Sequence, residues 1–230
     1  AYMYGLLGEV LKNQCACGGS AVLLSATLST SLRDKLLAAW NSEAAGDATN
    51  APYPALWHAT GSTVTPLTVA KTHRPPRRKV GIECLRLPAA YPDDDLRARI
   101  VAAARNGALV AVVVNLVDDA QRLARELRQL VADSPAIEVD IFHARYRFAD
   151  RQDKEAAALK HYGRSAPRGK GRILIATQVV EQSLDLDFDW LITQICPVDL
   201  LFQRLGRLHR HEREWRPPGF ETPRCSVLTV

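Results

Sequence analysis

Apolar and polar positions alternate in blocks along the chain, and from about residue 80 the blocks follow a regular order. Short, continuous apolar runs predict buried strands, and longer segments with apolar residues at helical spacing predict helices between them. The predicted strands cover 80–87, 109–114, 137–142, 172–176 and 190–196, and the predicted helices cover 93–106, 116–131, 144–162 and 199–211. This order predicts an α/β fold, with a parallel sheet covered by helices on both faces.

The first 40 residues show a shorter version of the same pattern. Apolar residues at helical spacing predict a helix over 2–14, and because no capping residue precedes it we expect the chain to be cut from something longer. An apolar run over 21–24 predicts a buried strand that ends in the small hydroxyl residues Ser25 and Thr27. A second helix is predicted over 31–40.

The segment 41–66 has no apolar period and is rich in Ser, Ala, Gly, Asp, Thr, Asn and Pro, which predicts a linker or an irregular insert. The stretch 71–79 is basic and interrupted by prolines, and its pattern favours a solvated linker over a dedicated nucleic-acid site. We therefore expect three parts, namely 1–41, a linker or insert over 42–70, and a main domain over 71–230.

Polar residues stand directly after four of the predicted strands, at Ser25, Asn115, His143 and Thr177. Ligands of open α/β sheets bind at the carboxyl ends of the strands. The sequence therefore predicts that these loops share one edge of a sheet and that this edge binds a ligand.

The predicted helix over 199–211 has one apolar and one polar face. Its apolar face carries Leu201, Leu205 and Leu208, and its opposite face carries Gln203, Arg207 and Arg210. Two guanidiniums and an amide at this spacing suit the oxygens of a polyphosphate. Gly206 lies between Gln203 and Arg207, where the missing Cβ would let another surface approach closely. The alternative is a solvated basic helix face.

A strand followed by an acidic loop precedes that helix. Thr177 follows the strand, where its hydroxyl could bond a backbone phosphate, and Asp185 could accept a hydrogen bond from a ribose hydroxyl. The alternatives are a helix cap for Thr177 and a solvated loop for Asp185, Asp187 and Asp189.

Composition changes this picture only in part. The net charge of +5 and the excess of arginine over lysine favour an anionic partner, although an Arg- and Ala-rich composition would also follow from a GC-rich genome. The five cysteines lack the spacing of a zinc site, so we expect a reduced, intracellular protein without a bound metal. The acidic triplet at 93–95 favours a capped helix start over a metal site. No apolar run reaches transmembrane length, so we expect a soluble, cytoplasmic chain without a membrane partner.

Three stretches together resemble known helicase motifs. They are SAT at 25–27, ATQVVEQSLDLDFD at 176–189 and QRLGRLHR at 203–210, which look like motifs III, V and VI of superfamily-two DExD/H helicases. A narrower resemblance is to the CRISPR-associated helicase–nuclease of type I systems. It rests on the residues of the last two stretches, together with VVVNLVDDAQ ending at Gln121 and FHARYRFADR from Phe142. The resemblance covers nearly the whole chain and is weakest over about 41–80.

This resemblance implies a fold and a set of residue roles. The main domain would be the second RecA-like lobe of the helicase core, preceded by a fragment of the first lobe. Gln203, Arg207 and Arg210 would act on the γ-phosphate of ATP, in a nucleotide-binding stretch that includes Gly206, and Asp185 would lie near the ribose. The remaining roles would be DNA contacts at Thr177, Asn115, His143 and Arg151, and coupling of ATP state to strand grip at Ser25 and Thr27.

Two expected helicase motifs are not found in the sequence. No P-loop of the form GxxxxGK[ST] and no DExx box occurs, and the nearest candidate, at 163–171, has the wrong spacing and precedes a strand. The histidine and aspartate cluster of the family's nuclease domain is absent too. ATP and Mg²⁺ would therefore be held mainly by the missing first lobe, and we expect this chain alone to lack ATPase activity.

The resulting expectation is part of an ATP-dependent translocase or helicase that acts on single-stranded DNA in CRISPR interference. The implied partners are single-stranded DNA, the first RecA-like lobe and nuclease domain of the same protein, and an RNA-guided surveillance complex. Two alternatives remain open, namely a non-catalytic nucleic-acid-binding module and a superfamily-two helicase with another substrate. A small-molecule Rossmann binder is disfavoured because no GxGxxG follows a strand.

Overall fold

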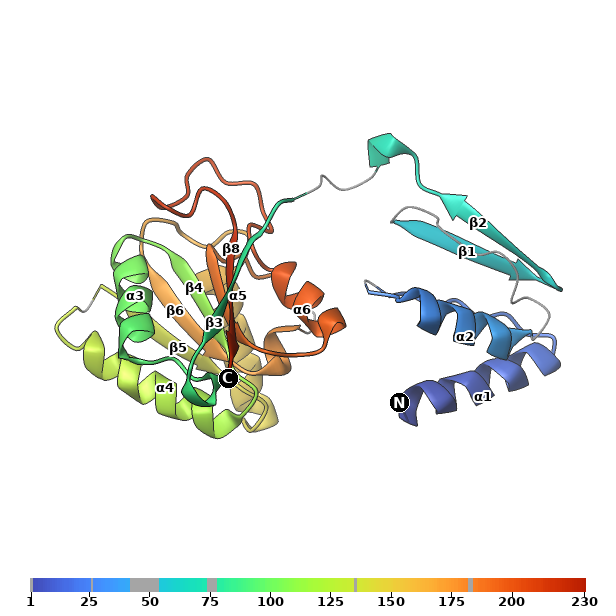
Figure 1. Cartoon of the computed structure of the whole chain (residues 1–230), viewed down its shortest axis with the longest axis horizontal. Coiled ribbons are helices and arrows are strands. Elements are labelled where there is room, and N and C mark those ends of the chain that lie inside the picture. The colour runs from blue at the N-terminus through green and yellow to red at the C-terminus, as the bar shows by residue number, and fades with distance from the viewer. Residues whose placement is uncertain (1, 26, 42–53, 74–77, 135, 182–183) are drawn as a thin grey trace. The chain divides into compact units, whose positions relative to one another are not determined.

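The computed structural model divides the chain into two compact units, Ala1–Arg78 and Lys79–Val230. It describes residues 2–25, 27–41, 54–73, 78–134, 136–181 and 184–230 (Figure 1). The division falls eight residues after the expected start of the main domain at 71. Four residues of the basic stretch 71–79, at positions 74–77, lie outside the described residues, as do residues 42–53 of the expected linker.

The second unit is built on one six-stranded sheet in the order β3-β8-β7-β4-β6-β5. All of its neighbouring strands are parallel, which confirms the predicted sheet. The strands are β3 (Gly81–Arg86), β4 (Leu109–Val113), β5 (Glu138–Phe142), β6 (Arg172–Ala176), β7 (Trp190–Gln194) and β8 (Arg224–Thr229).

Helices cover both faces of this sheet because the side chains of a strand alternate between the two faces. On one face, Val110, Val112 and their neighbours pack against α3 (Asp94–Arg105) and α4 (Val117–Leu130), which lie together in Figure 1. On the other face, Ala111 and Val113 belong to the cluster that includes residues of α5 (Phe148–Tyr162), and α6 (Val198–Leu205) packs against it through partly buried leucines. The core therefore lies in two layers on either side of the sheet.

One strand of the sheet was not predicted. β8 pairs with β3 on one side and β7 on the other, so it lies inside the sheet. Its apolar run is short and is interrupted by Ser226, which is fully buried. The Ser226 hydroxyl accepts a hydrogen bond from the Trp190 indole at 2.8 Å and donates one to Glu83 at 2.6 Å. These two partners remove the cost of burying a hydroxyl, so a polar residue is tolerated in an inner strand.

The start of α3 agrees with the sequence. Asp93 is its N-cap, and its side chain accepts a hydrogen bond from the Leu96 backbone at 2.9 Å. The acidic triplet therefore begins a helix, as expected.

The first unit contains two helices and a hairpin. The helices are α1 (Tyr2–Ala16) and α2 (Thr30–Trp40), as predicted, and β1 (Ala55–Thr60) pairs with β2 (Thr63–Thr68) in an antiparallel hairpin. The prediction of irregular structure over 41–66 is therefore wrong for the hairpin. A two-residue loop joins its strands, and Gly61 adopts a φ of 57°, which such a loop requires and glycine permits.

The strand predicted over 21–24 is also wrong. These residues form no strand, and Val22 and Leu24 are strongly exposed. A strand needs a neighbour to satisfy its backbone groups, and within the described part of the first unit the only sheet is the β1–β2 hairpin.

The helix predicted over 199–211 is shorter than expected. α6 ends at Leu205 with Gly206 as its C-cap, so Arg207 and Arg210 lie in the following loop and do not share a helix face with Gln203. Leu208 is buried, but it forms a bridge with Phe188 outside the helix. The leucine spacing therefore reflects burial, while the chain turns at Gly206.

No helix among the described residues is long and apolar enough to cross a membrane.

Candidate nucleotide and nucleic-acid site

Three of the predicted polar residues lie at one edge of the sheet, which we call the carboxyl edge. Asn115, His143 and Thr177 follow β4, β5 and β6, which are neighbours in the sheet. The Thr177 backbone N–H donates to the Phe142 carbonyl at 3.2 Å, which joins two of these strand ends directly. The prediction of a shared edge is confirmed for these three residues. It is wrong for Ser25, which belongs to the other unit and follows no strand.

The Thr177 side chain is only 1% exposed. Its hydroxyl is buried and makes no hydrogen bond within the described residues, so the structure shows no side-chain cap at this position. A hydroxyl buried without a partner costs about 1–3 kcal/mol. A ligand that reached this hydroxyl would therefore satisfy a group that the fold leaves unpaired.

His143 is also buried, at 4% exposure. Its ring stacks on Tyr146 with 4.2 Å between the ring centroids, and its Nε2 lies 3.3 Å from the Gln121 amide nitrogen. Burial lowers the pKa of His143 below its ordinary value, which favours the neutral imidazole at neutral pH. His143 therefore orders the loop after β5.

The other two predicted nucleic-acid contacts differ in exposure. Asn115 is exposed, and its side-chain amide donates to the Ile195 carbonyl at 3.1 Å, which ties the end of β4 to the end of β7. Arg151 is half-buried on α5 and forms an ion pair with Glu155 at 2.9 Å.

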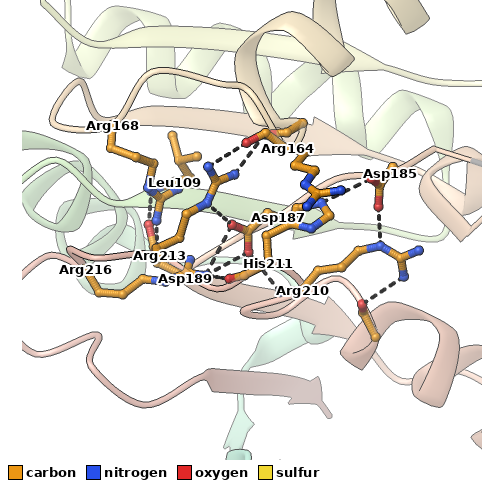
Figure 2. A network of polar contacts seen from close by, with 12 residues as sticks. Leu109, Arg164, Arg168, Asp185, Asp187, Asp189, Arg210, His211, Arg213 and Arg216 are labelled. Carbon is orange, nitrogen blue, oxygen red and sulfur yellow. Dashed lines mark hydrogen bonds and ion pairs between the residues drawn. The ribbon is translucent and has the colours of Figure 1, made fainter. Parts of the chain in front are cut away.

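The segment after α6, residues 206–211, carries the predicted catalytic arginines, and we call it the arginine loop. Arg207 is 9% exposed, and its guanidinium donates to the Glu181 carbonyl at 3.1 Å. Arg210 is more exposed and donates through Nε to Asp185, as Figure 2 shows. Gln203 is half-buried one turn earlier on α6, and Gly206 is exposed.

Asp185 is paired with basic groups of the arginine loop. Besides the Arg210 hydrogen bond, the His211 Nε2 lies 3.1 Å from the second carboxylate oxygen (Figure 2). The Arg210 hydrogen bond lowers the pKa of Asp185 below its ordinary value, and the nearby charges of His211 and Arg207 act in the same direction. Burial lowers the pKa of Arg207, although an arginine remains charged at neutral pH.

Two further aspartates lie beneath the arginine loop in a network that the sequence analysis missed. Asp187 and Asp189 are fully buried, so the alternative of a solvated acidic loop is wrong for both. Their partners are three arginines, shown in Figure 2, namely Arg168, Arg213 and Arg216. Asp187 also accepts a hydrogen bond from the Arg210 backbone N–H at 2.9 Å. The network therefore fixes the backbone of the arginine loop.

Arg204 was also missed. It is 1% exposed on α6, and its guanidinium donates to Glu181 at 2.7 Å and to the Thr193 hydroxyl. The sequence held a signal, because Arg204 is three residues after Leu201 and so falls on the packed face of the helix. A charged residue at such a position indicates a buried ion pair.

The coupling residues lie in the first unit. Ser25 is exposed, and its hydroxyl accepts a hydrogen bond from the Thr27 backbone at 3.2 Å. Their predicted role in coupling stays a prediction.

One group of side chains has the spacing of a cation site. Single ligand atoms of Glu138, Asp140 and His161 all lie within 4.8 Å of one another. They already have protein partners, because Glu138 pairs with Arg172 and Asp140 accepts from the Tyr162 hydroxyl at 2.8 Å. The adjacent guanidinium opposes a second cation here.

The arrangement around the arginine loop suits an anion. Its accessible charged groups are a guanidinium and a carboxylate that pair with each other, beside a second guanidinium that is nearly buried. Phosphate oxygens are acceptors that can replace a carboxylate opposite arginine. Arginine offers no lone pair to a metal, and the one carboxylate of the site, Asp185, already accepts from Arg210.

Comparisons with known proteins agree with this fold. The family model described as "CRISPR-associated nuclease/helicase Cas3, C-terminal" matches residues 106–213. The chain is 46% identical over 229 residues to the CRISPR-associated endonuclease/helicase Cas3 of Escherichia coli K12, a match that covers 99% of this chain and 26% of that protein. The chain thus spans about a quarter of the length of this relative.

Solved structures give the same result. A crystal structure described as T. fusca Cas3-ATP superposes with a TM-score of 0.85 at 29% identity, over 99% of this chain and 28% of that one. A structure described as a CRISPR RNA-guided surveillance complex, pre-nicking, contains a chain that superposes with a TM-score of 0.82 at 30% identity, over 99% of this chain and 30% of that one. Together with the parallel sheet covered on both faces, these likenesses confirm the predicted RecA-like fold class.

Proposed function

The chain belongs to the Cas3 family, and from that premise we propose that it supplies the arginine half of an ATP site in a helicase that moves along single-stranded DNA. The observation that carries the proposal is the arginine loop, which holds Arg207 and Arg210 beside Asp185. Action in CRISPR interference is part of the proposal and is supported by the names of the relatives.

Each side chain of the site has a proposed task. Arg210 exchanges its carboxylate partner for the γ-phosphate of ATP, since both accept hydrogen bonds from a guanidinium. Arg207 adds a second positive charge, held in place by its buried position and its bond to the Glu181 carbonyl. An arginine in this role is worth about 10³–10⁵ in rate.

Release of Arg210 frees Asp185 for a new partner. The carboxylate then accepts a hydrogen bond from a ribose hydroxyl, which places the nucleotide at the same loop. Gln203, on α6, is proposed to act on the γ-phosphate together with Arg207 and Arg210. The buried acids below keep the loop backbone in place during this exchange, because Asp187 holds the Arg210 N–H.

Phosphate binding and Mg²⁺ require groups beyond the arginine loop. We assign both mainly to a first RecA-like lobe, and residues 1–41, with Ser25 and Thr27, are proposed to belong to that lobe. The metal would neutralise charge on the phosphates. This chain contributes the arginine side of the proposed ATP site between the two lobes. Without the first lobe, the chain is expected to have no ATPase activity.

The carboxyl edge is proposed to be part of the DNA track. Asn115 is already accessible there. Contact of DNA with His143 or Thr177 requires the loops above them to move, because both side chains are buried. The surveillance complex enters as a proposed partner on the likeness to the chain in that complex.

The test is ATP hydrolysis measured with single-stranded DNA. The chain is assayed alone and then mixed with a separately produced first lobe that carries the P-loop and the acidic box. We expect ATP hydrolysis in the mixture and none by the chain without the first lobe. A mixture that associates but does not hydrolyse ATP would contradict the proposal and favour a non-catalytic binding module. The DNA affinity of such a module would fall as the salt concentration rises and would not change when nucleotide is added.

A further inference from the structure

The most exposed aromatic side chain among the described residues is Phe148, at 78% exposure. It is the first residue of α5, directly after the loop 143–147 that leaves β5 at the carboxyl edge. An exposed phenylalanine forfeits the stabilisation that burial of its ring would give. Phe148 lies beside the carboxyl edge, which we propose to be part of the DNA track.

The surroundings of Phe148 are cationic. Arg145 and Arg147 precede it and are exposed, and Arg151 lies three residues later, on the same side of the helix. Arg145 pairs with Asp118 and Arg151 with Glu155, so Arg147 is the cation that we assign to the phosphates. Asp150, two residues after Phe148, is offset from it around α5, and its charge acts on Tyr146 of the preceding loop. An apolar protein partner would not match an aromatic ring framed by guanidiniums, whereas a polyanion with flat, apolar bases would.

The loop that presents Phe148 is ordered by its own contacts. The His143 ring stacks on Tyr146 with an angle of 6° between the ring planes, and the Lys154 ammonium lies 5.6 Å from the Tyr146 centroid. Arg145 pairs with Asp118 of α4 at 2.6 Å, which ties the loop to the neighbouring helix. A platform fixed in this way loses little conformational freedom when a ligand binds.

We propose that Phe148 stacks on a base of single-stranded DNA while Arg147 contacts an adjacent phosphate. This inference rests on the proposed function and deepens it by naming an aromatic contact within the DNA track. It also gives the buried His143 a task, because that ring supports Tyr146 and the loop before Phe148. Stacking tolerates any base, so the contact fits a protein that moves along DNA of any sequence.

The experiment measures the affinity of the 230-residue chain for a fluorescent single-stranded oligonucleotide by anisotropy at low salt. Phe148→Ala is expected to weaken binding by about 5- to 150-fold, the loss that corresponds to one base–aromatic stack of roughly 1–3 kcal/mol. Phe148→Trp keeps the ring and is expected to bind as tightly as the parent chain. Leu159→Ala, an exposed apolar position at the other end of α5, is the matched control and should leave affinity unchanged.

An oligonucleotide of abasic sites separates stacking from other effects. On this probe, which keeps the phosphates, the chain and its Phe148→Ala variant are expected to bind equally. An equal loss on both probes, or no loss on normal DNA, would overturn the stacking contact and leave the proposed function standing. No binding of normal DNA by the parent chain would overturn both.

Discussion

At the scale of single residues, the charged groups of the candidate site are paired with one another. Asp185 accepts a hydrogen bond from Arg210 and lies beside His211. In the absence of nucleotide, the carboxylate that is proposed to bind a ribose is therefore paired with the guanidinium that is proposed to bind a phosphate. Both side chains are about 40–45% exposed, and an exposed ion pair of this kind contributes only about 0–1 kcal/mol. A nucleotide that bound as proposed would therefore displace this ion pair at small cost.

The pairing makes a prediction for the titration of Asp185. Arg210→Ala should raise the pKa of the Asp185 carboxyl towards its ordinary value, because the Arg210 hydrogen bond is the main cause of its lowering. The measurement is a carboxyl ¹³C NMR titration. Arg125→Ala, on an exposed part of α4, is the control and should not move this pKa. An unchanged titration in Arg210→Ala would show that the two side chains do not pair in solution.

The same pair sets a pH dependence of stability. Asp185 has a lowered pKa in the folded chain, so its contribution is present above the unfolded pKa and is lost as pH falls through the folded pKa. The contribution is small because the carboxylate is exposed.

At the scale of elements, the buried acids join two segments that are distant in sequence. Asp187 and Asp189 lie just before β7, and their partners Arg213 and Arg216 follow the arginine loop. The backbone adds to this link, because Phe188 N–H donates to the Arg207 carbonyl at 2.9 Å. His209 is held at a φ of 45° within the loop, a conformation that surrounding contacts must maintain.

Asp187→Asn is therefore expected to destabilise the chain strongly. It leaves the mostly buried Arg213 guanidinium with a neutral partner, while Arg216 keeps its ion pair with the buried Asp189. Loss of one partner of a buried ion pair costs about 3–5 kcal/mol. The free energy of unfolding, measured in urea, checks this value. Asp153→Asn is the control, since Asp153 is exposed on α5, and it should change stability by less than about 0.5 kcal/mol. Equal stability of the two variants would mean that the network does not support the loop.

Prediction from sequence succeeded where one property decided the structure. Apolar runs predicted five of the six strands of the main sheet. The signal is strongest for β4, β6 and β7, which are buried along their whole length, and weaker for the edge strands β3 and β5, which carry polar residues. It failed for β8, where Ser226 is buried only because Trp190 and Glu83 pair with its hydroxyl. It also extended α6 too far, because Leu208 continues the helical spacing although the chain turns at Gly206.

The exposure of the candidate site residues could not be predicted from the sequence. A charged side chain looks the same in a sequence whether it is solvated or paired, so the burial of Asp187 and Asp189 could not be foreseen. The arginines that pair with them are about 20 or more residues away in sequence. For the same reason Thr177 and His143 were expected to be accessible, and the structure places both below the surface.

At the scale of the whole molecule, the two units differ in their cores. Both large apolar clusters lie within the second unit. In the first unit, Leu11 is the one apolar side chain that is buried among the described residues. The first unit therefore has little apolar burial of its own to stabilise it.

We expect residues 79–230 to fold alone. Since both clusters are retained, the truncated chain should unfold in one cooperative transition with a stability within about 0.5 kcal/mol of that of the second unit in the complete chain. Urea unfolding followed by circular dichroism tests this. A broad, non-cooperative transition would show that the second unit depends on residues 1–78.

The most direct test of the central claim is ATP hydrolysis by the chain mixed with a first lobe and single-stranded DNA, compared between arginine variants. Arg207→Ala and Arg210→Ala should each lower the turnover rate by about 10³–10⁵, while Arg125→Ala leaves it unchanged. Binding of the two lobes, followed separately, should be the same for all variants. Turnover that survives both arginine substitutions, or robust turnover by the chain alone, would contradict the assignment of the arginine half of the site.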